Sequence, residues 1–165
     1  MAKQYLTFVV NDVLYAVEVF QVQEVLGYTK PVKLPCAQHY IEGLINSRDH
    51  GISIINLRAK FNMELKEPDK HTRIVVLEIN SDDGIVTVGA ITDSVEEVIE
   101  IDEKTIESAP KFGNAISAEF IKGIGKKDDR FIIILDVDKI FSFEEVKMLD
   151  SMSKEMDESN AEDAE

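Results

Sequence analysis

Tryptophan is absent from the 165-residue sequence, and tyrosine is scarce, with four residues. Grooves that bind proline-rich peptides are lined by aromatic side chains, so this composition opposes such a binding module. Cations are also few: 18 lysines and arginines against 32 aspartates and glutamates leave a formal net charge of −14. A chain this acidic repels phosphate backbones and anionic lipid surfaces. We therefore expect no nucleic-acid partner.

Cysteine and long apolar runs are lacking as well. Cys36 is the single cysteine, so no internal disulfide can form, which agrees with a reducing compartment. No apolar run approaches the roughly 20 residues that a membrane span requires. Residues 1–5 enter a strand-like pattern at once instead of forming a secretory leader. We expect a cytoplasmic protein with no direct insertion into a membrane.

The chain contains an internal repeat. Segment 41–61 reappears without a gap at 121–141, so that Gly43 matches Gly123 at an offset of 80 residues. A repeat of this kind indicates two copies of one small structural unit. The boundary between the copies is a natural place for a functional site.

Three short strands open each copy. Their residues alternate apolar and polar side chains and are rich in β-branched and aromatic types. Asn11 and Asp12 separate the first two strands and suit a tight turn, whereas the second copy has a turn at 80–84 that is three residues longer. The predicted strands are 4–10, 13–19 and 22–26 in the first copy and 73–79, 85–91 and 95–99 in the second.

Two nearly unbroken apolar runs, 52–57 and 131–137, are rich in isoleucine. Runs of this length are typical of strands that are buried on both faces, so we expect them to be the central strands. The chain before each run is predicted to be irregular, with at most a short helix at 36–42 in the first copy and a loop at 102–119 in the second.

The C-terminal part changes character. Apolar residues at helical spacing predict a short helix from Ser142 to about Met156, and the acidic stretch 157–165 is predicted to be a disordered tail. The pattern as a whole predicts a mostly β protein with two small five-stranded antiparallel barrels. We place them at about 11–72 and 73–141, and a shared hydrophobic interface should compensate for their small individual cores.

Motifs for catalysis and for metal binding are lacking. His39, His50 and His71 lie at loop-like positions without a cysteine or carboxylate at metal-ligand spacing. Neither a glycine-rich phosphate loop nor a nucleophile elbow occurs. We therefore expect a protein that is not an enzyme and has no metal and no cofactor.

Arg48 breaks the symmetry of the repeat. It lies in a predicted turn of the first copy, and Asp128 takes its place in the second. A position outside the repeat suggests a binding role, and a surface arginine paired with Asp49 explains the residue pattern equally well. Gly43 and Gly123, by contrast, occupy the same position in both copies, which favours a shared backbone constraint.

Many spaced positions carry a further signal. They are 5–10, Val22, Gln23, Glu24, Val25, Ile41, Gly43, Asn46, Arg48, Ile54, Ile55, Leu57, Arg58, 72–79, 89–98, Ala109, Pro110, Ile121, Gly123 and Ile124. With these residues the chain resembles the CheW family of bacterial chemotaxis coupling proteins over about 4–150. The resemblance implies one domain over 1–150, built from two SH3-like barrels around a common core.

The resemblance also implies a function in two-component signal transduction. Proteins similar to this one are non-catalytic adaptors that bridge the cytoplasmic tip of a methyl-accepting chemoreceptor to the regulatory domain of the histidine kinase CheA. They are recruited to receptor arrays at the inner face of the membrane, and we expect a monomer in isolation. The receptor hairpin would lie in the groove between the barrels. The positions that match receptor or kinase coupling positions of the family are Val22, Glu24, Gly43, Asn46, Arg48 and Ile74.

The chain departs from the family around Arg48. Ser47 and Asp49 stand where the family usually has leucine and glycine, and Ser53 and Asn56 replace a common proline and aspartate. Asp49 lacks the easy access of glycine to positive φ and places a carboxylate beside Arg48. Two alternatives stay open: a divergent CheW paralogue that scaffolds another chemosensory-type array, and a general peptide-binding SH3-like module.

Overall fold

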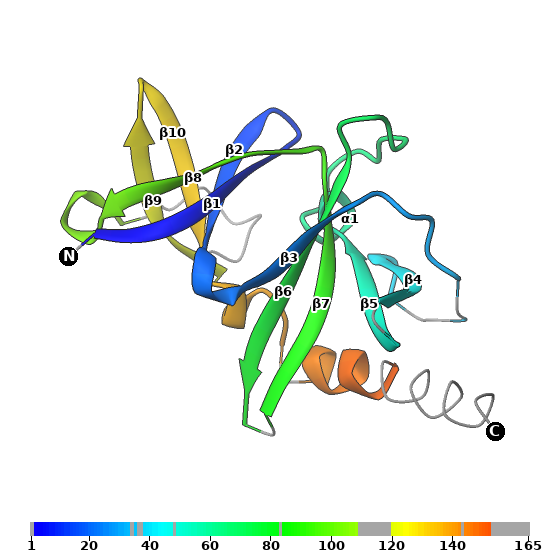
Figure 1. The fold of residues 1–165 in the computed structure, drawn as a ribbon. Coiled ribbons are helices and arrows are strands. Elements are labelled where there is room, and N and C mark those ends of the chain that lie inside the picture. The colour runs from blue at the N-terminus through cyan, green and yellow to red at the C-terminus, as the bar shows by residue number, and fades with distance from the viewer. Residues whose placement is uncertain are drawn as a thin grey trace.

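β-Strands make up most of the chain in the computed structural model (Figure 1). The structure describes residues 2–33, 35, 38–47, 49–82, 84–108, 120–142 and 144–152. The elements in chain order are β1 (Ala2–Val10), β2 (Val13–Glu18), the 3₁₀ turn η1 (Val19–Gln21), β3 (Val22–Gly27), β4 (Ile41–Ser47), β5 (His50–Asn56), α1 (Leu57–Lys60), β6 (Arg73–Ser81), β7 (Gly84–Thr92), β8 (Ser94–Asp102), η2 (Glu103–Thr105), β9 (Ile121–Lys127), β10 (Arg130–Leu135) and η4 (Val137–Lys139). Residues 144–152 are helical.

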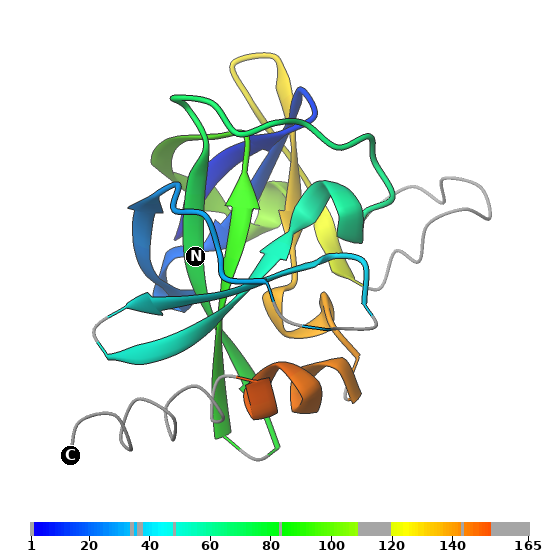
Figure 2. The same cartoon turned by 90° about the vertical axis from the view of Figure 1, so that its right-hand side faces the viewer.

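The strands form two five-stranded sheets. One has the order β8-β1-β2-β10-β9 and is called barrel A here; the other has the order β3-β6-β7-β5-β4 and is called barrel B (Figures 1 and 2). β10 pairs with β2, and β5 pairs with β7, in parallel; the other neighbours are antiparallel. The sheets are therefore mixed and not fully antiparallel as predicted.

The two copies of the repeat exchange their opening hairpins. β1 and β2 of the first copy join the last three strands of the second copy in barrel A, and β6 and β7 join β3, β4 and β5 in barrel B. The predicted bounds of about 11–72 and 73–141 therefore coincide with neither barrel. The exchange also explains the parallel pairs, because the fifth strand of each copy pairs with a hairpin of the other copy.

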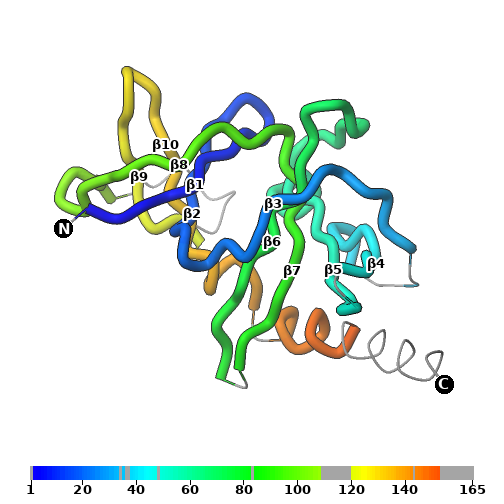
Figure 3. The backbone as a smooth tube through the Cα atoms, in the orientation of Figure 1, coloured from blue at the N-terminus to red at the C-terminus, as the bar shows by residue number. Residues whose placement is uncertain are grey.

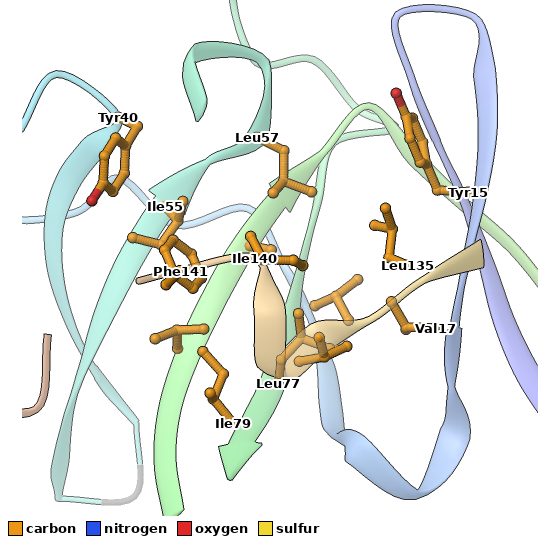
Figure 4. Close-up of a cluster of buried hydrophobic side chains, with 14 of the residues drawn as sticks. Tyr15, Val17, Tyr40, Ile55, Leu57, Leu77, Ile79, Leu135, Ile140 and Phe141 are labelled. Atoms are coloured by element: carbon orange, nitrogen blue, oxygen red, sulfur yellow. The ribbon is translucent and has the colours of Figure 1, made fainter. Parts of the chain in front are cut away.

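Three hydrophobic clusters fill the molecule. One lies inside barrel A and one inside barrel B. The largest lies between the barrels, and Figure 4 shows part of it. Alternate residues of one strand serve different clusters: Ile132 and Ile134 belong to the cluster of barrel A, whereas Leu135 belongs to the inter-barrel cluster. The predicted shared interface and the burial of β5 and β10 on both faces are confirmed. The strands in the middle of the sheets, however, are β2 and β7.

The turns follow from local sequence. Asn11 and Asp12 both have positive φ, 52° and 63°, as a two-residue type I′ hairpin turn requires. In the second hairpin the ladder continues to the pair Ser81 and Gly84, so this turn also has two residues and the longer turn predicted at 80–84 is wrong. Glu42 lies in β4, so the short helix predicted at 36–42 does not extend to its last residue.

Polar contacts join the barrels at two places. The guanidinium of Arg58 donates from Nε to Oδ1 of Asp93 at 3.0 Å, and the Asn11 N–H donates to Oδ2 at 2.8 Å. Burial raises the pKa of Asp93, but these hydrogen bonds lower it by more. The pKa of Asp93 is therefore below its ordinary value. At the other place the Asn80 N–H donates to Oδ1 of Asp138 at 2.9 Å. The barrels are therefore held together by more than apolar contact.

The C-terminal helix covers the inter-barrel cluster. Val146 and Leu149 are buried in that cluster, and Nζ of Lys60 lies 2.8 Å from Oε2 of Glu145. The Tyr40 hydroxyl also donates to Glu145. The predicted helix is confirmed over 144–152, and its last residues and the predicted tail lie outside the described residues.

Candidate partner-binding site

Four of the predicted site residues lie on the two edge strands of barrel B. Val22 and Glu24 lie on β3, and Gly43 and Asn46 lie on β4. The Ser47 Oγ donates to Oε1 of Glu24 at 3.3 Å and so connects the two edges. We call this junction of β3 and β4 the B seam. Residues that are about 20 positions apart in the chain are thus brought together there.

A hollow of about 490 Å³ opens along the B seam. Both edge strands and the segment that follows β3 contribute to it. Its wall combines the apolar side chains of Leu26 and Val32 with the amide of Asn46 and the hydroxyl of Ser47. A partner at this seam would meet apolar area together with a few polar groups, which is the usual make-up of a protein-binding site.

Gly43 supports the hollow from within the barrel. Its φ is 140°, and a Cβ atom at this position would lie 2.0 Å from the carbonyl oxygen of Val32. Val32 and Leu44 exchange two backbone hydrogen bonds there, of 2.8 and 3.0 Å. The glycine is buried, so it shapes the seam through the backbone and offers a partner no side chain.

Ile74 does not lie on the surface. Its side chain has 0% exposure and belongs to the cluster inside barrel B. Ile74, which the resemblance predicts to be a receptor or kinase coupling position, therefore offers a partner no side-chain surface, and any effect on a partner passes through β3 and β7, the strands that pair with β6. Leu26 of β3 is its cross-strand neighbour and packs against the same cluster. Arg48, the strongest candidate of the sequence, lies outside the described residues.

Two exposed valines at equivalent positions of the repeat were not among the predicted site residues. Val25 on β3 is 40% exposed and Val98 on β8 is 53% exposed, and the two occupy equivalent positions of the repeat. Val25 pairs with Val75 and Val98 pairs with Leu6, and both partners belong to the inter-barrel cluster. Both strands lie on the near side of the molecule in Figure 3. Their shared offset of 73 residues was the signal that could have identified them.

Three of the departures from the family pattern take part in the fold. Ser53 is buried and its Oγ donates to the Leu149 carbonyl of the C-terminal helix at 3.2 Å. Asn56 accepts the Ala59 N–H at 3.2 Å and so caps α1. Asp49 has a φ of 65°, a left-handed conformation that aspartate tolerates better than most residues. Asp49 therefore adopts the turn that glycine would favour.

The described residues contain no cluster of three or more histidine, cysteine, aspartate or glutamate side chains placed to bind a metal. In the same part of the chain, no helix is both long and apolar enough to cross a membrane.

Comparison with known proteins agrees with this geometry. The family model of the CheW-like domain matches residues 4–145. The chain belongs to the CheW family. It is 29% identical to the chemotaxis protein CheW of Klebsiella aerogenes, over 93% of this chain and 90% of that protein, and 31% identical to that of Treponema pallidum, over 88% and 86%. The crystal structure of the scaffolding protein TtCheW from Thermoanaerobacter tengcongensis superposes with a TM-score of 0.76 at 35% identity and covers 86% of this chain and 89% of that one. The predicted family and the two-barrel fold class are confirmed.

Proposed function

We propose that this CheW-family chain is a non-catalytic adaptor in bacterial chemotaxis that couples chemoreceptor signalling tips to the histidine kinase CheA. Membership in the family supports the adaptor function, since the relatives are named chemotaxis proteins and the similar crystal structure is that of a scaffolding protein. The two partners and the recruitment to receptor arrays at the membrane belong to the proposal.

One observation carries the placement of the receptor. Val22, Glu24 and Asn46 lie on adjoining edge strands, beside the exposed Val25 and across the barrel junction from Val98. An amphipathic helical hairpin needs apolar area with a few polar groups at its border. The two valines supply that area on both sides of the junction, and the carboxylate and amide of the B seam supply directed hydrogen bonds. The receptor tip therefore docks over the inter-barrel junction and reaches the B seam.

The experiment replaces the apolar area. We expect Val25→Asp and Val98→Asp each to weaken co-sedimentation with receptor fragments and CheA. Each variant places a charge in a desolvated contact, which should reduce the binding free energy by about 2 kcal/mol or more. Ile85→Asp is the matched control, because Ile85 is 62% exposed on β7 but lies near the turn at the far end of the β6–β7 hairpin.

All three variants should keep the circular dichroism spectrum of the parent chain. Full receptor-dependent kinase activation by the double variant of Val25 and Val98 would contradict the docking site. Binding to the receptors of another chemosensory array, with no binding to chemotaxis receptors, would identify a divergent paralogue.

A further inference from the structure

Barrel B has a second hollow, of about 460 Å³, at one of its ends. β3, β5 and β7 end around it and β4 and β6 begin there, so it is the mouth of the barrel. Tyr28 and Ile91 form an apolar floor, since both pack against the cluster inside barrel B. Mouths of small β-barrels are common ligand sites, and the volume lies within the range of roughly 300–1,000 Å³ that such sites have.

Cationic side chains line this mouth in a chain that is otherwise strongly acidic. Lys30, Lys33, Arg58 and Lys66 all contribute to the lining. Within the described residues, Lys30 and Lys33 take part in no ion pair. Lys66 lies 3.3 Å from Asp69, and both side chains are largely exposed. Lys30 and Lys33 are thus the cations of the mouth whose charge no described ion pair offsets.

Carboxylates also line the mouth, but two of them are engaged. Asp93 accepts two hydrogen bonds from the guanidinium of Arg58, and Oε1 of Glu42 accepts from Nδ2 of Asn56 at 2.9 Å. The third carboxylate, Glu67, lies on an exposed segment of the rim. Arg58 offsets the charge of Asp93, whereas the neutral amide of Asn56 leaves Glu42 its charge. No described ion pair joins Glu42 or Glu67 to Lys30 or Lys33, so the two ammonium groups are available to an anion.

The equivalent end of barrel A has different charged contacts. Glu103 and Lys122 stand at the repeat positions of Lys30 and Glu42, with the charges reversed. Nζ of Lys3 lies 2.8 Å from Glu103 and 3.0 Å from Glu18. Lys122 also reaches Glu18, at 3.1 Å. Ion pairs therefore tie the charged side chains of this end to one another, whereas Lys30 and Glu42 form no such pair at the mouth of barrel B.

We propose that the mouth of barrel B binds a small organic anion, a carboxylate or a phosphate ester. Lys30 and Lys33 hold the anionic group, and Tyr28 and Ile91 pack against the carbon skeleton of the ligand. The proposal does not rest on the adaptor function, because it concerns a site that the isolated chain already has.

The test is isothermal titration calorimetry of the full chain with citrate and with glycerol 3-phosphate, at an ionic strength held constant with sodium chloride. We expect saturable binding of at least one probe, and a Kd at least about tenfold higher in the double variant Lys30→Gln, Lys33→Gln. Lys126→Gln is the control, since Lys126 is an exposed lysine of barrel A, and it should leave the Kd unchanged.

Absence of saturable binding of both probes to the parent chain overturns the proposal. Equal weakening by Lys126→Gln overturns it too, because it would show attraction by net charge alone. Amide chemical shifts of Tyr28 and Ile91 that move on titration of the parent chain support the site, and shifts confined to other residues count against it.

Discussion

The edge strands of the two barrels meet through different chemistry. In barrel A, Lys127 of β9 lies 3.3 Å from Glu97 of β8, and Arg130 lies 3.0 Å from Glu96. In barrel B the repeat positions of Lys127 and Glu97 hold Ser47 and Glu24, and the contact is a hydrogen bond from a hydroxyl. At these equivalent positions, the described contact is an ion pair in barrel A and a hydrogen bond from a hydroxyl group in barrel B.

This difference has little weight for stability. The side chains of the ion pairs in barrel A are between 34% and 60% exposed, and pairs of this kind contribute about 0–1 kcal/mol. The difference between the seams matters more for recognition. A partner at the B seam meets a hollow beside a hydroxyl group and an amide, whereas the equivalent positions of barrel A present paired charges. The two copies have kept the fold and have diverged in what their seams offer to a partner.

The largest expected effect concerns the equivalent glycines of the two barrels. Gly43→Ala should destabilise the protein by about 3 kcal/mol or more, because φ is positive and the added Cβ meets a backbone carbonyl. Gly123→Ala should cost less, about 1–3 kcal/mol, because φ is not positive there and the nearest backbone atom, the Glu107 carbonyl oxygen, would lie 2.8 Å from the added Cβ, against 2.0 Å for the Val32 oxygen at Gly43. Urea unfolding of both variants measures the difference, and equal losses would contradict the asymmetry.

The next effect concerns the helix that is tied to barrel B. Burial raises the pKa of Glu145, but hydrogen bonds from Lys60, Tyr40 and the Ser142 N–H outweigh it and lower the pKa to about 2. The carboxylate therefore contributes stability above its unfolded pKa, and this contribution is lost as the pH falls from about 4.5 towards 2. Glu145→Gln should remove that part of the acid sensitivity and cost about 1–2 kcal/mol at neutral pH.

Thermal unfolding of parent and Glu145→Gln between pH 7 and pH 3 gives the measurement. Glu144→Gln is the control, since Glu144 is an exposed neighbour in the same helix. If both variants followed the pH profile of the parent, the contact between Glu145 and Lys60 would not contribute the stability proposed here.

A smaller effect is expected when the seams are exchanged. Ser47→Lys gives the B seam the cation of barrel A, and it should weaken receptor binding about tenfold while stability changes by less than about 1 kcal/mol. Lys127→Ser makes the reverse change in barrel A and should leave receptor binding intact. Co-sedimentation of both variants tests this, and a loss confined to Lys127→Ser would move the docking site to barrel A.

The smallest effect concerns two equivalent turn residues. Asp49 and Asp129 both have a φ of 65°. Replacing either residue by glycine should remove the strain of the left-handed conformation in the folded state. The more flexible unfolded chain offsets part of this gain, so the net stabilisation should be up to about 0.5 kcal/mol. Chemical denaturation should show the same change in both variants. A clear loss of receptor binding in Asp49→Gly alone would show that the Asp49 carboxylate contributes to recognition beside Arg48.

Much of the candidate site could be located from the sequence. Val22, Glu24 and Asn46 were identified by resemblance, and the structure brings them to one seam. Ile74 was predicted as a coupling position by the same resemblance, but its side chain is buried, and an isoleucine in a strand that is apolar on both faces gives no sign of which face a partner can reach. Val25 and Val98 were missed because a single exposed valine is ordinary in any sequence.

The sequence by itself determined the local elements. Alternation with a period of two set most of the strands, Asn11 and Asp12 set a type I′ turn, and the spacing after Ser142 set the terminal helix. These features depend on neighbours within a few residues, so they can be predicted without knowledge of the fold.

Only the tertiary structure decided which hairpin completes which barrel. β1–β2 and β6–β7 carry the same pattern, so either could close either sheet, and the pattern alone does not distinguish the two arrangements. In the structure each hairpin joins the other copy, where one of its faces fills a barrel and the other the inter-barrel cluster. The hydrophobic effect rewards buried area without regard to distance along the chain, and for that reason the exchange, and with it the junction between the barrels, is visible only in three dimensions.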